Sequence, residues 1–88
     1  MKTAFRSTFI KDLKAIRDKA LLSRVQEVIE AAENADTLTS LRNLKRIKGA
    51  NNYYRVRIGE YRIGLYLEAE AVTFVRFLHR REIYRYFP

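Results

Sequence analysis

Three arginines, Arg55, Arg57 and Arg62, stand within eight residues of one another in a stretch that alternates apolar and polar side chains. An arginine guanidinium binds phosphate through two parallel hydrogen bonds and stays charged at physiological pH. Residues two apart on a strand point to the same face and lie roughly 7 Å from each other. Arg55 and Arg57 therefore have a spacing that suits successive phosphates of an extended nucleic-acid strand. The same pattern also fits a solvated basic face of a sheet.

The arginines belong to a predicted β-hairpin whose strands are joined at Gly59-Glu60. Glycine as the first residue of a two-residue loop suits a type II′ turn, which places Arg57 opposite Arg62 and Gly64 opposite Arg55. Like charges opposed across a sheet destabilise it, so this pairing points to a functional requirement. One face of the hairpin is expected in the core and the other at the surface. The core face carries Tyr54, Val56, Ile58, Tyr61, Ile63 and Leu65, and the surface face carries Arg55, Arg57, Arg62 and Tyr66.

The last ten residues hold a second concentration of reactive side chains, beginning with His79, Arg80, Arg81 and Glu82 and continuing to Tyr84. A short helical turn is expected from Arg81. A single histidine suits a structural role as well as proton transfer, and a single tyrosine suits packing. Because this segment is expected to lie next to the arginine face, however, its residues together are predicted to form one wall of a site.

Basic residues also precede the hairpin. Lys45, Arg46 and Lys48 lie just before a loop expected from Gly49 to Asn52. They form either a solvated connection or an electrostatic rim beside the arginine face. Three leucines upstream have a spacing compatible with one more helical turn. These are Leu38, Leu41 and Leu44.

Two amphipathic helices are expected to support this surface. Ser7 and Thr8 are good N-caps ahead of an apolar stripe that starts at Phe9 and recurs with helical spacing. Asp18 is expected to cap a second helix, which ends near Asn34. The two helices predict an αα-hairpin that covers one face of a sheet.

The remaining segments complete an α+β fold with two layers. Residues 2–6 predict a short first strand, and residues 72–79, apolar on both faces, predict an interior strand. Arg76 lies in that strand and is expected either on the arginine face or near an edge, because a buried arginine is almost always paired. We expect a single domain, residues 1–88, in which an N-terminal strand and the αα-hairpin pack on one face of an antiparallel sheet. A short C-terminal helical turn ends the chain.

The positive charge of the chain is unevenly distributed. The net charge is +8, of which residues 1–44 contribute +2 and residues 45–88 contribute +6. This asymmetry favours a polyanionic partner, which is a nucleic acid, an acidic protein or an anionic membrane. Membrane binding ranks last because it usually requires a basic amphipathic helix, whereas the basic half of this chain is strand-like.

The composition also excludes several classes of protein. The chain has no cysteine and one histidine, which excludes a disulfide framework and a zinc site built on thiolates. No apolar run is long enough to cross a bilayer, and no apolar signal region follows Met1. These features predict a soluble cytoplasmic protein that uses no metal and no cofactor.

Taken together, the motifs resemble those of the RelE/ParE superfamily, toxins of type II toxin–antitoxin modules. The matching fragments cover nearly the whole chain. The most specific is Tyr-Arg-x-Arg-x-Gly-x-Tyr-Arg at residues 54–62, followed by Arg-Arg-Glu-x-Tyr at residues 80–84. RelE-like members of the superfamily cut mRNA in the decoding site of the ribosome. ParE-like members poison DNA gyrase and lack the ribonuclease residues, and Arg81 with Tyr84 places this chain on the RelE side.

The resemblance implies an endoribonuclease in which a ribose 2′-OH attacks the adjacent 3′ phosphate. It implies that Arg62 and Arg81 hold the transition state, that Arg57 positions the strand, and that Tyr84 stacks on a base or transfers a proton. The residues expected to contact RNA are Arg55, Lys45, Lys48, Tyr66, His79 and Arg80.

One departure from the family pattern affects the proton transfers. Positions 55 and 57 are lysine in the best-known RelE toxins and arginine here, and arginine effectively does not release its proton. His79 and Glu82 are therefore candidates for the acid and base. Two alternatives remain, a toxin that inhibits gyrase and a simple nucleic-acid-binding domain. For either toxin, the expected partner is an acidic antitoxin with a segment that folds on binding.

Overall fold

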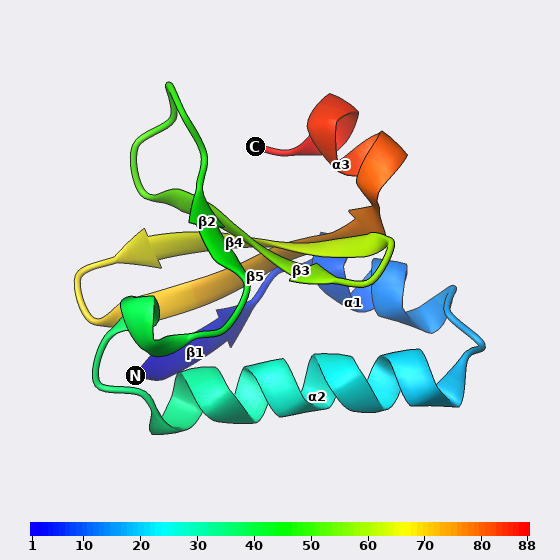
Figure 1. The fold of residues 1–88 in the computed structure, drawn as a ribbon, viewed down its shortest axis with the longest axis horizontal. Coiled ribbons are helices and arrows are strands. Elements are labelled where there is room, and N and C mark those ends of the chain that lie inside the picture. The colour runs from blue at the N-terminus through cyan, green and yellow to red at the C-terminus, as the bar shows by residue number, and fades with distance from the viewer.

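A five-stranded sheet in the order β1-β5-β4-β3-β2 forms the centre of the structure, a computed structural model that describes residues 1–88 (Figure 1). The elements in chain order are β1 (Lys2–Phe5), α1 (Ser7–Lys14), α2 (Lys19–Asn34), a 3₁₀ turn (Leu38–Ser40), β2 (Leu44–Arg46), β3 (Tyr53–Ile58), β4 (Tyr61–Glu68), β5 (Ala71–His79) and α3 (Arg80–Tyr86). No helix has both the length and the apolar character that a membrane span requires.

The α+β fold class is confirmed, and the structure adds two details. Strand β1 joins the sheet parallel to β5, whereas the other neighbours pair antiparallel, so the sheet is mixed. Helix α2 lies along one face of the sheet and α3 lies on the opposite side (Figure 1). The C-terminal helix therefore covers part of the face that the two-layer prediction left open.

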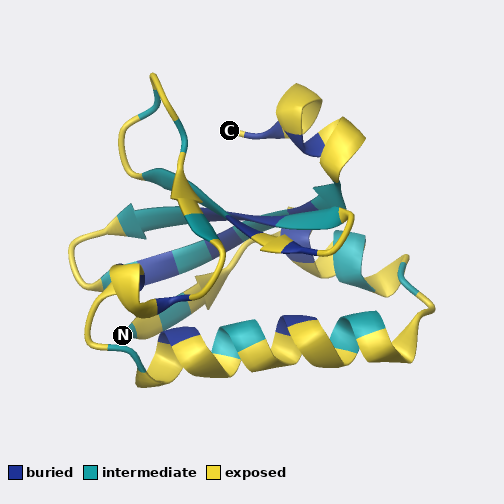
Figure 2. Ribbon diagram, in the orientation of Figure 1, coloured by how far each residue is buried: buried dark blue, intermediate teal, exposed yellow.

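The hydrophobic core fills the space between the sheet and the N-terminal helices, where the buried segments in Figure 2 meet. It consists of Phe9, Val25, Ala32, Leu38, Leu41, Val56, Ile58, Ile63, Leu65, Val72, Phe74 and Phe77. Alternate residues of β3 and β4 supply its sheet side, as period-two patterning requires. The other alternate residues of these strands are thereby directed to the opposite face.

The register of the β3–β4 hairpin is as predicted. Arg57 pairs with Arg62, and Arg55 pairs with Gly64. Gly59 has φ +57° while Glu60 does not enter the positive-φ region, which is the pattern of a type II′ turn. Three arginines therefore emerge on the face opposite the core.

The helix starts were predicted with mixed success. Asp18 caps α2, because its Oδ1 accepts hydrogen bonds from the Ala20 and Leu21 N–H groups at 3.0 and 3.2 Å. The prediction that Ser7 or Thr8 caps α1 is wrong. Helix α1 begins at Ser7 after Arg6 and has no side-chain cap; the Thr8 hydroxyl instead donates to the Val75 carbonyl at 2.7 Å.

The predicted helical turn across the three upstream leucines is only partly right. Leu38 lies in a 3₁₀ turn and Leu41 is buried after it, but Leu44 begins strand β2. Asn43, at φ +60°, breaks the helical run, and its carbonyl accepts the Arg57 N–H at 3.1 Å. Lys45 is therefore on a strand paired with β3, and not in a connecting segment.

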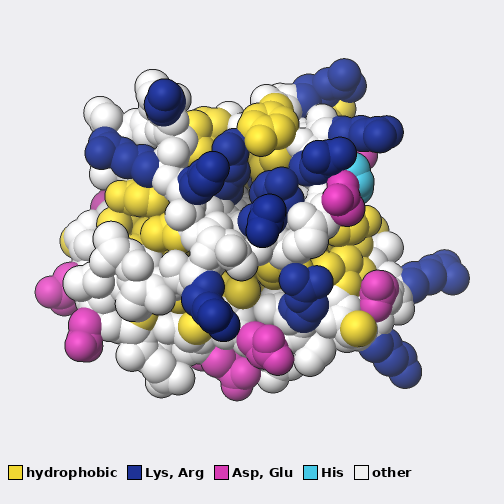
Figure 3. Space-filling view, viewed as in Figure 1, with side chains coloured by type: hydrophobic (Ala, Val, Ile, Leu, Met, Phe, Trp, Pro, Cys, Tyr) yellow, Lys and Arg dark blue, Asp and Glu magenta, His cyan; other side chains and the backbone are white.

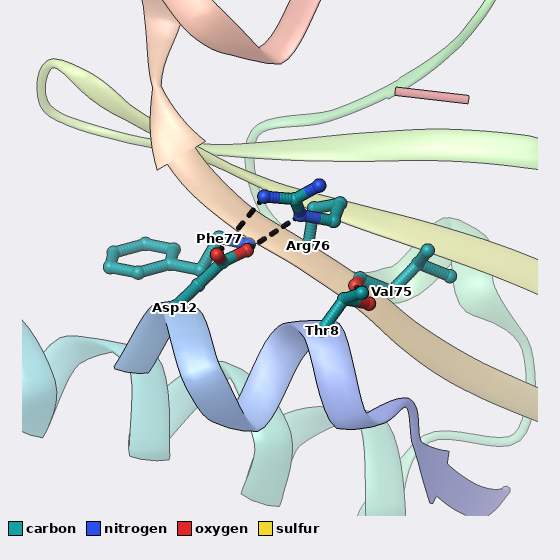
Figure 4. A network of polar contacts seen from close by, with 5 residues as sticks. All are labelled: Thr8, Asp12, Val75, Arg76 and Phe77. Atoms are coloured by element: carbon teal, nitrogen blue, oxygen red, sulfur yellow. Dashed lines mark hydrogen bonds and ion pairs between the residues drawn. The ribbon is translucent and has the colours of Figure 1, made fainter. Parts of the chain in front are cut away.

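Helix α1 replaces β1 along the edge of β5, as Figure 4 shows. Strand β1 ends at Phe5, and beyond it the backbone of β5 bonds to side chains of α1. The Thr8 hydroxyl donates to the Val75 carbonyl, and the Asp12 carboxylate accepts the Phe77 N–H at 2.9 Å. The Asp12 carboxylate also accepts from Arg76 Nε and Nη2 at 2.8 and 3.1 Å.

This ion pair settles the position of Arg76. The residue lies on the arginine face, in register with Gly64, and also near the sheet edge, beyond the end of β1. Its side chain is 24% exposed and that of Asp12 is 12% exposed. Hydrogen bonding to Asp12 raises the pKa of Arg76 above its ordinary value. The arginine is thus half-buried because it is paired, as expected for a charged group inside a protein.

We expect Asp12→Asn to lower the free energy of unfolding by about 2–3 kcal/mol, because it keeps the size of the side chain but weakens charge-assisted hydrogen bonds. Urea denaturation measures this change. Asp36→Asn is a matched control, because Asp36 is exposed and makes no ion pair, and should change stability by less than about 0.5 kcal/mol. Equal stabilities of the two variants would contradict the role given to Asp12.

The C-terminal segment is anchored to the sheet where the Phe87 ring packs on Gly64, which has no side chain to block it. The ring of Phe87 is 5% exposed and lies against Gly64. A Cβ atom at residue 64 would lie 2.7 Å from two ring carbons of Phe87. Tyr53 contacts the same ring edge-on at 5.5 Å between centroids, and Ile83 provides a second buried anchor for α3.

We expect Gly64→Ala to destabilise the protein by about 1–3 kcal/mol, the usual cost of overpacking, by forcing the Phe87 ring outward. A double-mutant cycle with Phe87→Ala tests this, because the alanine at 64 should cost far less once the ring is gone. Urea denaturation of the four proteins provides the cycle. Additive effects of the two substitutions would show that the ring and Gly64 do not interact.

Candidate functional site

A cationic hollow of about 390 Å³ lies on the face of the sheet opposite the core. Residues from β2, the β3–β4 hairpin and α3 contribute to it, so three segments distant in sequence meet there. Its lining residues are Asn43, Leu44, Lys45, Arg55, Arg57, Arg62 and Tyr84. Figure 3 shows Lys and Arg side chains clustered over the upper part of the molecule, whereas most acidic side chains lie lower.

A row of paired residues crosses the sheet beneath this face. Lys45 pairs with Arg55, Arg55 with Gly64, and Gly64 with Arg76. The C-terminal segment lies over the row: Phe87 occupies the space above Gly64. The gap between the two arginines is therefore filled by an aromatic ring and not by a charge.

Tyr84 is held against Arg55. The Arg55 guanidinium carbon lies 4.9 Å from the centroid of the Tyr84 ring, a cation–π contact. Tyr86 makes the equivalent but longer contact with Arg76, at 5.8 Å. Tyr84 is nevertheless 64% exposed, so most of its surface is free to contact a ligand.

Arg62 is partly fixed by the hairpin turn. Its Nη1 donates to the carbonyls of Gly59 and Tyr61, both at 2.9 Å. Arg62 is also one of the residues that line the hollow, and neither Arg62 nor the opposed Arg57 forms an ion pair. The site thus keeps several uncompensated positive charges, which is unfavourable for folding and suitable for binding phosphate.

Three other predicted residues lie outside the hollow, on or next to α3. The Nδ1 atom of His79 accepts the Arg81 N–H at 3.2 Å, so the histidine caps the helix. Arg80 pairs with Glu60 at 2.9 Å. Arg81 is exposed and does not line the hollow, but it lies three residues before Tyr84 and so on the same face of α3.

Lys48 and Tyr66 are farther from the hollow. Lys48 borders a separate depression on the loop after β2. Tyr66 pairs with Tyr53, with ring centroids 4.9 Å apart. A hydrogen bond to the Glu68 carboxylate, together with its charge, raises the pKa of Tyr66, which keeps the phenol neutral.

Sequence reasoning missed two parts of the site. Asn43 and Leu44 line the hollow, but nothing in their types marks them as site residues. The second part is the contact between Gly64 and Phe87, which helps to position Tyr84. A glycine within an otherwise regular strand often marks the close approach of another group, and this was the one feature of the sequence that pointed to the contact.

The arrangement is suited to holding a phosphodiester. Four cationic side chains surround the hollow, and the aromatic ring of Tyr84 stands at its wall. Lys45 and Tyr84 are the two lining residues that can transfer a proton, because arginine effectively does not. No group of three His, Cys, Asp or Glu residues with the geometry of a metal site occurs in residues 1–88.

Known proteins resemble this chain over most or all of its length. The family model described as the ParE toxin of the type II toxin–antitoxin system, parDE, matches residues 4–84. Toxin RelE3 of Methanocaldococcus jannaschii is 44% identical over 89 residues, covering 100% of both chains. Putative toxin RelE1 of the same organism is 32% identical and covers 83% of this chain and 81% of the relative.

Solved structures give the same result. The toxin in the RelB-RelE antitoxin-toxin complex from Methanococcus jannaschii aligns with a TM-score of 0.83 and 41% identity, covering 97% of this chain and 99% of that one. The archaeal RelE-RelB complex from Pyrococcus horikoshii, at 18% identity and a TM-score of 0.73, covers 90% and 93% of the two chains and shares the fold. The resemblance seen in the sequence is thus confirmed: the chain belongs to the RelE/ParE superfamily of type II toxin–antitoxin toxins and, within it, to the RelE family.

Proposed function

We propose that this toxin is a ribosome-dependent endoribonuclease that cleaves mRNA and so inhibits translation. The observation that carries the proposal is the convergence of Arg55, Arg57, Arg62, Lys45 and Tyr84 on one hollow without acidic partners. Folding gains nothing from such a cluster, since like charges opposed on a sheet repel each other. A bound phosphodiester supplies the missing negative charge.

The proposed reaction is attack of a ribose 2′-OH on the adjacent 3′ phosphate, which leaves a 2′,3′-cyclic phosphate. Negative charge builds on the phosphate oxygens in the transition state, where fixed cations are most effective. Arg62 is preorganised for this role by its bonds to the turn carbonyls. Arg81 lies outside the hollow but three residues before Tyr84 on α3, and its long side chain would reach the same phosphate from there.

The other residues of the hollow position the RNA. Arg55 and Arg57 are two apart on β3 and follow the backbone of the strand. One side of the Tyr84 ring lies against Arg55, and its exposed surface can stack on an unpaired base, a contact typical of single-stranded RNA recognition. In this way Tyr84 orients the nucleotide whose phosphate meets Arg62.

Toeprinting of a defined mRNA on translating ribosomes tests the proposal. Purified protein should generate new 3′ ends at discrete positions within codons, and it should leave the same mRNA intact without ribosomes. Inhibition of gyrase supercoiling without new mRNA ends would instead identify the gyrase-directed activity. Absence of both effects would leave only nucleic-acid binding and would reject the proposal.

In the same assay we expect Arg62→Ala to lower the single-turnover cleavage rate by ~10²–10³, the usual loss when one preorganised donor to the transition state is removed. Arg81→Ala should lower the rate to a comparable extent. Arg17→Ala is the matched control: it removes one positive charge from an exposed position between α1 and α2, and its rate should stay within about 3-fold of wild type, since surface changes away from the site have small effects. An Arg62 variant as active as the Arg17 variant would remove Arg62 from the mechanism.

We also propose that an acidic antitoxin holds this toxin inactive, as the RelB-RelE complexes of the structural relatives suggest. Its segment would cover the arginine face and fold on binding. Complementary charge mainly accelerates association, so the on-rate should fall steeply as salt rises from 50 to 200 mM while the off-rate changes less. Surface plasmon resonance at several salt concentrations measures both rates. An on-rate indifferent to salt would contradict electrostatic recognition.

A further inference from the structure

We propose that Lys45 is the general acid that protonates the departing 5′-oxygen during this cleavage. The proposal rests on the proposed ribonuclease function and assigns one of its steps to a residue of β2. The leaving group requires a side chain near the hollow that can release a proton to it.

Most side chains around the site cannot perform this step. Arg55, Arg57 and Arg62 stay protonated throughout. The Nδ1 atom of His79 is engaged with the Arg81 N–H at the start of α3, and the imidazole lies edge-on to Tyr61 at 5.6 Å between centroids. The histidine therefore caps α3 at the end of β5, and it does not line the hollow.

The nearby carboxylic acids are also absent from the hollow. Glu60 is paired with Arg80 at 2.9 Å. Glu82 is exposed in the first turn of α3 and is not among the lining residues. The sequence-based suggestion that His79 or Glu82 supplies the acid is thus not supported by their positions, and Lys45 and Tyr84 remain.

Lys45 has the position that the step requires. It pairs directly with Arg55 across β2 and β3, and both residues line the hollow with Arg57 and Arg62. It forms no ion pair, so its ammonium protons are available to a ligand. An ammonium is a much stronger acid than an alcohol, so proton transfer to a departing alkoxide is favourable.

Tyr84 is better suited to binding than to this transfer. Its ring is fixed by the Arg55 guanidinium at 4.9 Å, and its exposed surface faces outward, as base stacking requires. Tyr84 holds the base, and Lys45 completes the departure of the 5′-oxygen.

The 2′-OH loses its proton to solvent water as its oxygen forms a bond to phosphorus. The bond between phosphorus and the 5′-oxygen breaks, and its electron pair goes to that oxygen. One ammonium proton of Lys45 passes to the 5′-oxygen, and the neutral amine then regains a proton from solvent, so the products are a cyclic phosphate and a free 5′-OH.

The test compares two mRNAs that differ in one atom, the bridging 5′-oxygen or a bridging 5′-sulfur at the cleavage site. Sulfur leaves as a thiolate, whose conjugate acid has a pKa of ~8.5, and does not need an acid. On programmed ribosomes under saturating single-turnover conditions, Lys45→Arg, which keeps the charge, should cut the oxygen mRNA ~10²–10³ more slowly than wild type. On the sulfur mRNA the two proteins should differ by less than about 3-fold, since the missing general acid is no longer required.

Control variants make the outcomes distinct. Arg62→Ala, which removes charge stabilisation, should be slow on both mRNAs, and Lys14→Arg, an exposed change on α1, should be normal on both. Equal losses by Lys45→Arg on the two mRNAs, or no loss on either, would overturn the proposal. Rescue of Tyr84→Phe by sulfur without rescue of Lys45→Arg would assign the acid to Tyr84. Failure of wild type to cut either mRNA would reject the ribonuclease function itself.

Discussion

The register of the β3–β4 hairpin is the constraint on which the rest of the structure depends. Side chains on a strand alternate between faces, so a shift of one residue would move every core residue to the surface and every arginine into the core. The two-residue turn at Gly59 fixes the pairing of Arg57 with Arg62. The apolar residues on the other face are then directed toward α2, where their burial holds the register in place.

This register concentrates like charges on one face, and the structure stabilises them in different ways. Arg76 forms an ion pair with Asp12 of α1, near the edge of the sheet. Arg62 donates to two carbonyls of its own turn, and Arg55 lies against the ring of Tyr84. Of these three arginines, only Arg76 has its charge neutralised by a carboxylate. The remaining cations keep their charge for a ligand, which separates the structural arginine from those of the site.

Local patterns predicted the elements well, and long-range contacts were beyond their reach. The hairpin register, the Asp18 cap and the C-terminal helix follow from turn chemistry, capping and helical spacing, all of which act over a few residues. Strand β2 was missed because three residues carry no period of their own, and its pairing with β3 is a tertiary choice. Thr8 has the chemistry of an N-cap, but its hydroxyl donates to the Val75 carbonyl of β5, 67 residues away.

In the candidate site, too, local patterns placed some residues and long-range contacts decided the others. Arg55, Arg57 and Arg62 could be placed on one face from period two alone, and Tyr84 could be suspected from its neighbours. The sequence could not tell that Lys45 joins them while Arg80 and His79 do not, because these outcomes depend on β2 pairing, on Glu60 and on the start of α3.

The site is assembled from two parts of unequal stability. The arginines are on central strands whose other face is buried in the core, whereas Tyr84 is on a seven-residue helix held by Ile83 and by Phe87 above Gly64. Elements with few buried contacts open at the lowest free-energy cost. Displacing Phe87 would therefore remove Tyr84 from Arg55 and leave the hairpin folded. In the proposed complex, an antitoxin segment that competes for the space above Gly64 would remove Tyr84 from the site without contacting every cation, and it would expose Arg55 to its own acidic residues.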